Sequence, residues 1–159
     1  MSALSDKTRE RIRAEFAKYP NKRAATLPAL HIVQDEHRQV SVEALREVAG
    51  LLELYPAEVN DTLSFYGFFR GEADPLGAHR LWVCRSLSCA LRGGEELLAE
   101  ISKRLQVEPG ATTADGKITL EFAECLGACE GAPCVLVDDE CRTNITAESA
   151  TQLIQELRK

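Results

Sequence analysis

Four cysteines of this chain form two pairs, and each pair follows a stretch with the pattern of a β-strand. Cys84 comes directly after the strand-like residues 80–83, and Cys89 follows it with the spacing Cys-x4-Cys. Cys125 and Cys129 follow the alternating run at 118–122, with the spacing Cys-x3-Cys, and 35 residues separate the two pairs. Alternation of apolar and polar residues predicts a half-buried strand. Two strand ends that each present two thiols therefore predict a four-thiolate site.

Four thiolates can bind either a zinc ion or an iron–sulfur cluster. Zinc sites mostly use a two-residue gap within each pair. Wider gaps suit a [2Fe-2S] cluster, in which each pair holds one iron and the loop reaches around the bridging sulfides. The spacing therefore favours a [2Fe-2S] cluster held by Cys84, Cys89, Cys125 and Cys129. Two alternatives stay open: a zinc site, and four ordinary buried thiols, since free cysteine is often buried.

A cluster with four thiolates is anionic, so its surroundings should supply backbone N–H donors and positive charge. Gly93, Gly127 and Gly131 allow the backbone to approach closely, because glycine has no Cβ. Arg85 and Arg92 are near the first pair in sequence and could offset the negative charge.

Two further cysteines follow the second pair. Cys134 comes five residues after Cys129 and Cys141 seven residues after Cys134, so a cluster held by Cys125, Cys129, Cys134 and Cys141 is conceivable. However, Cys134 opens the apolar run 135–137, where a small hydrophobic residue is expected. We therefore interpret Cys134 and Cys141 as structural.

The first half of the chain predicts four short helices. The expected segments are residues 5–19, a helix from about Leu27-Pro28, one capped by Ser41, and one that opens at Pro56. The aromatic cluster Phe65, Tyr66, Phe68 and Phe69 should be core between the helices and a sheet, or else a partner-docking surface. The segment 67–77 is predicted to be a loop, because it contains Gly67, Asp74-Pro75 and the glycine that opens Gly77-Ala-His.

The second half predicts a small sheet with helices packed on it. The expected order is a strand at 79–84, a helix at about 91–106, a strand at 118–123, a strand at 135–137, a possible hairpin partner at 140–143, and a helix capped by Thr146. The predicted fold class is α+β, with a helical N-terminal region over 1–70 and a cluster domain over 78–159.

Composition excludes several classes of protein. The formal charge of -6 argues against a nucleic-acid partner, which would require a basic patch. There is no apolar run of about 18 residues, so no membrane insertion is expected. The N-terminal stretch has no apolar core, so it is not expected to be a secretory signal, and a cytoplasmic location follows. In a reducing cytosol, six cysteines are expected to be ligands or buried thiols rather than disulfides.

Motifs for other chemistry are absent from the sequence. There is no Cys-x-x-Cys, so thioredoxin-type thiol–disulfide exchange is not expected. There is no G-x-G-x-x-G and no G-x-x-x-x-G-K, so neither a dinucleotide nor a nucleotide phosphate has an evident binding loop. We therefore predict no catalytic residues in this chain.

The cysteine motifs resemble those of a known family. Cys84-x4-Cys89-Ala-Leu-Arg-Gly, Glu124-Cys-Leu-Gly-Ala-Cys129 and Ala132-Pro133 are similar to the thioredoxin-like [2Fe-2S] subunit of NADH dehydrogenases, the NADH-quinone oxidoreductases of respiratory complex I. Residues 19–25, 27–30, 56–59 and 64–66 are similar to the helical part of the same family. The resemblance covers the sequence from about residue 10 to its end.

This resemblance implies a helical N-terminal part followed by a thioredoxin-like domain, with the [2Fe-2S] cluster on Cys84, Cys89, Cys125 and Cys129. It also implies a partner subunit that carries FMN and binds NADH, in a peripheral arm on the cytoplasmic face of the inner membrane. In relatives an apolar residue usually stands at Cys134 and an aromatic one at Cys141. Similar subunits serve NAD-reducing hydrogenases and NAD-dependent formate dehydrogenases, and a free-standing ferredoxin is a further alternative.

Overall fold

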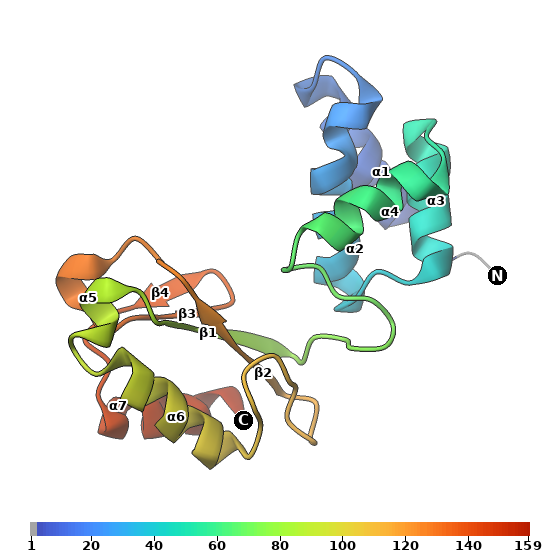
Figure 1. The fold of residues 1–159 in the computed structure, drawn as a ribbon. Helices are drawn as coiled ribbons and strands as arrows, with labels where there is room; N and C mark the ends of the chain where they lie inside the picture. The colour runs from blue at the N-terminus through green and yellow to red at the C-terminus, as the bar shows by residue number, and fades with distance from the viewer. Residues whose placement is uncertain (1–2) are drawn as a thin grey trace. The chain divides into compact units, whose positions relative to one another are not determined.

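The computed structural model describes residues 3–159 (Figure 1). Residues 1 and 2, which open the predicted helical region, lie outside the described residues. The protein divides into two compact units, residues 1–75 and Leu76–Lys159. The division lies within the segment 67–77 for which the sequence predicts a loop, and each unit is described by itself below.

The first unit is helical. Its α-helices are α1 (Asp6–Glu15), α2 (Thr26–His37), α3 (Val42–Leu52) and α4 (Pro56–Phe65), with 3₁₀ turns at Phe16–Lys18 and Lys22–Ala25. The Ser5 hydroxyl accepts the Thr8 backbone N–H at 3.1 Å, and the Ser41 hydroxyl accepts that of Ala44 at 3.0 Å. Each bond satisfies a donor that the first helical turn leaves unpaired, which is why α1 and α3 begin where the sequence predicts.

The helical unit has its own hydrophobic core. Its fully buried side chains include Ile12 of α1, Leu30 and Val33 of α2, and Leu52 of α3. Burial of these faces stabilises helices that would be too short to persist alone in water.

Three residues of the aromatic cluster belong to the core of the helical unit. Phe69 is buried in it, and Tyr66 and Phe68 pack against it. The His31 ring stacks on Phe68 with ring centroids 5.1 Å apart. Phe65, at the end of α4, is 79% exposed and takes no part in this core.

The second unit contains a four-stranded mixed sheet. Its strands are β1 (His79–Cys84), β2 (Ile118–Ala123), β3 (Val135–Val137) and β4 (Glu140–Arg142), in the spatial order β2-β1-β3-β4. β1 pairs in parallel with β2 and antiparallel with β3, and β3 forms an antiparallel hairpin with β4. The connection between β1 and β2 contains a helix, as a parallel pair requires.

Two helices cover one face of this sheet. They are α6 (Gly94–Leu105) and α7 (Ala147–Leu157), which lie side by side against it (Figure 1). Ile101 of α6 and Leu153 of α7 share one core with Leu81 of β1 and Leu120 of β2. Because side chains alternate across a strand, the next residues along β1 and β2 point to the other face. There Glu121 forms an ion pair with Arg80, whose guanidinium lies 4.3 Å from the centre of the Trp82 ring.

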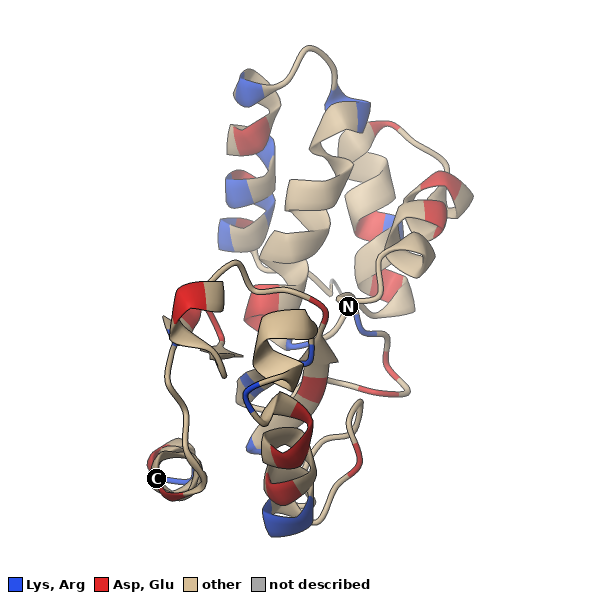
Figure 2. Cartoon of the chain, turned by 60° about the vertical axis from the view of Figure 1, so that its left-hand side comes forward, with Lys and Arg blue, Asp and Glu red and all other residues tan. Residues whose placement is uncertain are grey.

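Charged residues of both signs are interspersed over the protein (Figure 2). Along α6, acidic residues occupy the first turn and basic ones the last, an arrangement that favours the helix dipole. None of the described helices combines the length and apolarity needed to cross a bilayer.

The predicted α+β class is confirmed, and the strands at 79–84 and 118–123 have the predicted bounds. The predicted helix at 91–106 is only partly right. Helix α6 starts at Gly94, and a separate single-turn helix, α5 (Leu87–Ala90), lies within the first cysteine loop. The hairpin partner at 140–143 and the Thr146 cap of α7 are also observed.

Candidate metal centre

The two cysteine loops lie at the same edge of the sheet. β1 and β2 run in parallel with Cys84 opposite Ala123, so both strands end at that edge. The first loop leaves from Cys84 and the second from Ala123. The parallel pairing therefore brings the two predicted cysteine pairs, far apart in sequence, to neighbouring strand ends.

The first pair is buried and tightly packed. Cys84 is the last residue of β1 and Cys89 lies in α5, and both have at most 2% of their surface exposed. Gly94 lies directly against this loop. A Cβ added there would lie 2.8 Å from the Cys89 carbonyl carbon and oxygen and 3.0 Å from the Cys84 carbonyl oxygen. The close approach requires glycine at position 94, a position that sequence reasoning did not select.

The second pair is exposed and held by a turn. Cys125 and Cys129 lie in the loop after β2, with their sulfur atoms 3.8 Å apart. Gly127 between them has φ +80°, a left-handed conformation that glycine adopts without strain. Gly131 packs against Thr143 so closely that a Cβ would lie 2.5 Å from the Thr143 Cβ. Gly127 thus permits the turn of this loop, and Gly131 permits its close packing against Thr143. That these glycines let the backbone approach a cluster stays a prediction.

The two loops contact each other. The Cys84 sulfur lies 3.3 Å from the Glu124 carbonyl oxygen and also accepts the backbone N–H groups of Ser86 and Leu126. The Ser88 side chain, next to Cys89, interacts with the Cys129 sulfur. The second loop therefore supplies one N–H donor, that of Leu126, to a thiol of the first, and N–H donors are what an anionic metal centre requires.

The structure adds a third thiol to the buried pair. The Cys134 sulfur lies 3.7 Å from that of Cys89, and the sulfur atoms of Cys84, Cys89 and Cys134 all lie within 4.8 Å of one another. Cys134 is there because β3 runs antiparallel to β1, so its first residues meet the last residues of β1. The Cys84 N–H donates to the Cys134 carbonyl at 3.1 Å. The sequence places Cys134 just before a predicted strand. Its position next to Cys84 and Cys89 follows only once β3 is known to run antiparallel to β1.

Cys141 lies elsewhere. It is exposed on β4, opposite Leu136 in the hairpin, and it is not a member of the three-thiol group. Among the described residues, Cys84, Cys89 and Cys134 form the group of potential ligands that the structure brings within 4.8 Å of one another.

Burial and hydrogen bonds affect these thiols differently. Burial raises the pKa of Cys84, but the N–H groups of Ser86 and Leu126, together with Cys89 and Cys134, outweigh it, so the pKa is below its ordinary value. Burial raises the pKa of Cys89, and Cys84 raises it further, whereas hydrogen bonds with Cys134 act in the opposite direction. Burial also raises the pKa of Cys134, and the Cys89 and Cys84 thiols raise it further. The neighbouring Cys125 raises the pKa of Cys129. Cys84 is therefore the member of the buried group that loses its proton most readily.

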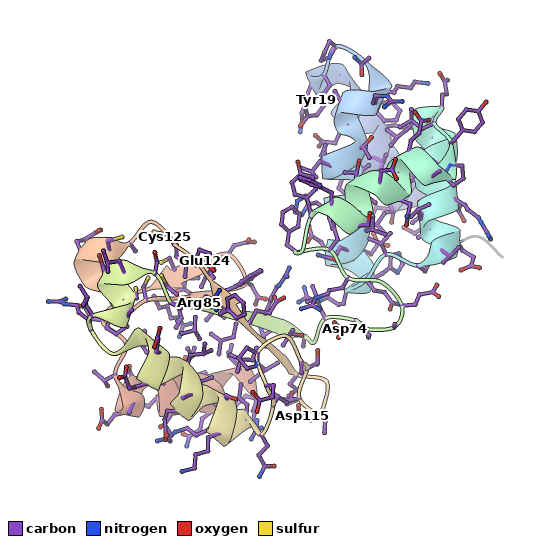
Figure 3. All side chains as sticks on the ribbon, in the orientation of Figure 1. Tyr19, Asp74, Arg85, Asp115, Glu124 and Cys125 are labelled. Carbon is purple, nitrogen blue, oxygen red and sulfur yellow. The ribbon has the colours of Figure 1, made fainter. Side chains whose placement is uncertain are left out.

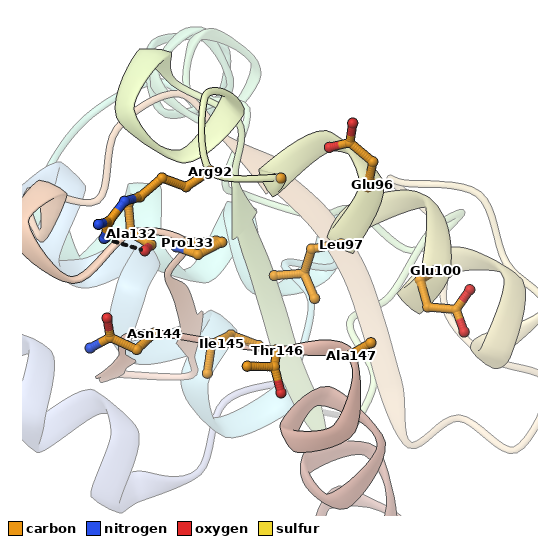
Figure 4. Close-up of a pocket in the computed structure, with 11 residues that line it drawn as sticks. Arg92, Glu96, Leu97, Glu100, Ala132, Pro133, Asn144, Ile145, Thr146 and Ala147 are labelled. Carbon is orange, nitrogen blue, oxygen red and sulfur yellow. Dashed lines mark hydrogen bonds between the residues drawn. The ribbon is translucent and has the colours of Figure 1, made fainter.

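The two predicted arginines lie beside the cysteine loops. Arg85 donates to the Glu124 carboxylate at 2.7 Å, and its guanidinium lies 3.7 Å from the centre of the Phe122 ring; Figure 3 shows Arg85, Glu124 and Cys125 close together. Arg92 donates to the Ala132 carbonyl at 3.2 Å, at one end of an open cleft of about 630 Å³ (Figure 4). The cleft is otherwise lined by α6 and the residues before α7. Positive charge thus lies next to both loops.

The residues present fit a [2Fe-2S] cluster. Two thiol pairs lie on contacting loops, backbone N–H groups point at Cys84, and glycines permit the backbone to pack closely around the first pair. Cys84, Cys89, Cys125 and Cys129 are the thiols that would hold such a cluster, which would supply one-electron transfer.

Comparison with known proteins agrees with this geometry. Residues 12–158 match the family model "Thioredoxin-like [2Fe-2S] ferredoxin". The protein is 40% identical over 150 residues to a subunit of NADH-quinone oxidoreductase from Rhizobium meliloti (strain 1021), covering 94% of this protein and 88% of the relative. It is 33% identical over 153 residues to a subunit of NADH-quinone oxidoreductase from Escherichia coli (strain K12), covering 96% and 90%.

Among solved structures, the protein is similar to one polypeptide of an NAD+-reducing [NiFe]-hydrogenase in the air-oxidized state. The TM-score is 0.73 at 24% identity, over 84% of this protein and only 22% of that longer one. This likeness concerns the fold alone. Together with the family model and the relatives, the convergence of the two cysteine loops shows that the protein belongs to the thioredoxin-like [2Fe-2S] ferredoxin family.

Proposed function

We propose that this protein is an electron-transfer subunit of an NADH-quinone oxidoreductase and holds one [2Fe-2S] cluster on Cys84, Cys89, Cys125 and Cys129. The observation that supports it most is the meeting of the two cysteine loops at the ends of the parallel strands β1 and β2. A bound [2Fe-2S] cluster accepts and donates one electron at a time.

The residues of this protein divide the work of holding such a cluster. Cys84 and Cys89 shield one side from water, because both are buried. Cys125 and Cys129 are exposed, so the other side is open to an electron donor or acceptor. Leu87 and Leu91, one helical turn apart around Cys89, are 73% and 79% exposed. A partner that covers these leucines would also lie close to the metal centre.

The proposal requires a second subunit. NADH gives up a hydride, which carries two electrons, whereas a [2Fe-2S] cluster accepts one. A flavin can separate the pair, and this sequence has no loop of the kinds that bind dinucleotides or nucleotide phosphates. We therefore place FMN and the NADH site on a partner subunit, in a peripheral arm on the cytoplasmic side of the membrane.

We prefer NADH-quinone oxidoreductase over an NAD-reducing hydrogenase or an NAD-dependent formate dehydrogenase as the complex that contains this subunit. The reason is that relatives at 33–40% identity are named as subunits of NADH-quinone oxidoreductase. The likeness to the NAD+-reducing hydrogenase, at 24% identity, concerns the fold. A free-standing ferredoxin would have no evident use for the helical unit of residues 1–75.

The test uses the protein reconstituted with iron and sulfide under anaerobic conditions. NADH alone should not bleach its visible absorption, and addition of the flavin-containing subunit should make bleaching rapid. Bleaching of the lone, flavin-free protein by NADH would refute the proposed division between subunits. A colourless protein with one bound zinc would refute the cluster itself.

A further inference from the structure

The buried end of the metal centre contains one thiol more than a cluster held by two pairs requires. Cys84, Cys89 and Cys134 have 2%, 1% and 1% of their surface exposed, and their sulfur atoms lie within 4.8 Å of one another. They come from three different segments, the end of β1, helix α5 and the residue before β3. The sheet register fixes two of them, since the Cys84 N–H donates to the Cys134 carbonyl at 3.1 Å.

The spacing of these sulfur atoms suits a single metal ion. A metal–sulfur bond of about 2.3 Å places three sulfur atoms around an ion at about 4.0 Å from one another in a trigonal plane. The Cys89 and Cys134 sulfur atoms are already 3.7 Å apart, and the remaining separations are no greater than 4.8 Å. Movements of less than about 1 Å would therefore complete the site.

The donor set selects the kind of ion. Three thiolates without an oxygen or nitrogen donor favour a soft ion, and Cu(I) is stable with three sulfur ligands in a plane. Zinc requires a fourth ligand in structural sites, and no fourth His, Cys, Asp or Glu joins the group among residues 3–159.

We propose that, in the cluster-free protein, Cys84, Cys89 and Cys134 form a buried three-thiolate site that binds one Cu(I) ion. Binding releases the thiol protons to solvent and leaves copper in the same oxidation state, so no oxidant or reductant is consumed.

The site also has a consequence for cluster assembly, and this part rests on the proposed function. Cu(I) on Cys84 and Cys89 occupies two of the four ligands proposed for the [2Fe-2S] cluster. Copper and cluster therefore exclude each other, and Cys134 is the residue that makes the copper site competitive.

The first experiment measures copper affinity alone. The anaerobic, cluster-free full-length protein is titrated with Cu(I) in competition with bathocuproine disulfonate. Wild type should bind about one Cu(I) per molecule, with three sulfur neighbours by X-ray absorption. Cys134→Ala and Cys134→Ser should each weaken binding by more than roughly ten-fold, because one ligand is lost. Cys141→Ala, the control at an exposed thiol, should bind as wild type does.

A second variant separates this site from the exposed pair. Cys125→Ala/Cys129→Ala keeps all three buried thiols and should retain wild-type copper affinity. Unchanged affinity in both Cys134 variants, or loss of binding in the Cys125/Cys129 variant, would overturn the proposal. Circular dichroism of each variant excludes unfolding as the cause.

The competition is tested by adding iron and sulfide to protein preloaded with one Cu(I). Wild type should take up little cluster, and Cys134→Ala should take up several-fold more. If copper reduced cluster uptake equally in wild type and in Cys134→Ala, the proposed competition would be contradicted. Copper-free samples of the same proteins measure cluster binding separately, so failure of the proposed cluster and failure of the copper site give different results.

Discussion

The two cysteine pairs differ in how the protein holds them. Cys84 and Cys89 are buried, and Gly94 packs against the carbonyl groups of both residues. Cys125 and Cys129 are exposed, and Gly127 between them is left-handed with open space around the position of a Cβ. The first pair is fixed by packing and the second by backbone conformation. This difference predicts that the two loops will respond differently to the same kind of substitution.

The largest expected effect comes from removing a ligand from either pair. Cys84→Ala and Cys125→Ala should both abolish or strongly reduce the iron and sulfide content of the reconstituted protein, because each leaves one iron a thiolate short. Cys141→Ala is the matched control and should keep the full content. Retention of a normal cluster by either of the first two variants would contradict the assignment.

The packing of the buried loop should make Gly94 the most sensitive glycine. In Gly94→Ala the new Cβ would lie 2.8 Å from the Cys89 backbone, so the helix or the loop must shift. We expect a loss of about 1–3 kcal/mol in the free energy of unfolding, measured by urea denaturation of the cluster-free protein. Gly50→Ala, a helical site with nothing within 4 Å, is the control and should be neutral or stabilising.

The exposed loop should tolerate the same change better. Gly127→Ala creates no clash, but it places an alanine at φ +80°, which costs about 1 kcal/mol. We expect a smaller loss of stability than for Gly94→Ala and slower cluster reconstitution, followed by absorbance. A larger loss than for Gly94→Ala would reverse the comparison between the loops.

The smallest effect is expected from removing the helical unit, because both cysteine pairs lie in the second one. We predict that a fragment of residues 76–159 folds and takes up as much iron and sulfide as the full-length protein. An insoluble fragment, or one that stays colourless after reconstitution, would show that the cluster domain depends on the helices.

Much of the fold was predictable because its signals are local. Ser5, Ser41 and Thr146 begin helices by accepting backbone N–H groups three residues on. The alternating run at 118–122 predicts β2 correctly. Helix α5 was missed because a single helical turn between two cysteines is too short to show periodicity.

The candidate site was predictable only in part. Pairing of the two cysteine loops follows from parallel strands, which the spacing suggests but does not prove. Cys134 was interpreted as structural because its sequence context is apolar. Its place beside Cys89 depends on β3 running antiparallel to β1, and the direction of a three-residue strand is a tertiary property that local sequence does not specify.

The most direct test of the four-ligand account uses a variant that keeps only those four cysteines. Cys134→Ala/Cys141→Ala leaves Cys84, Cys89, Cys125 and Cys129, and is reconstituted anaerobically with iron and sulfide. The account predicts about two irons and two acid-labile sulfides per molecule, with the visible spectrum of a [2Fe-2S] protein. A variant that stays colourless while the wild-type protein is coloured would contradict it, because the cluster would then require Cys134 or Cys141.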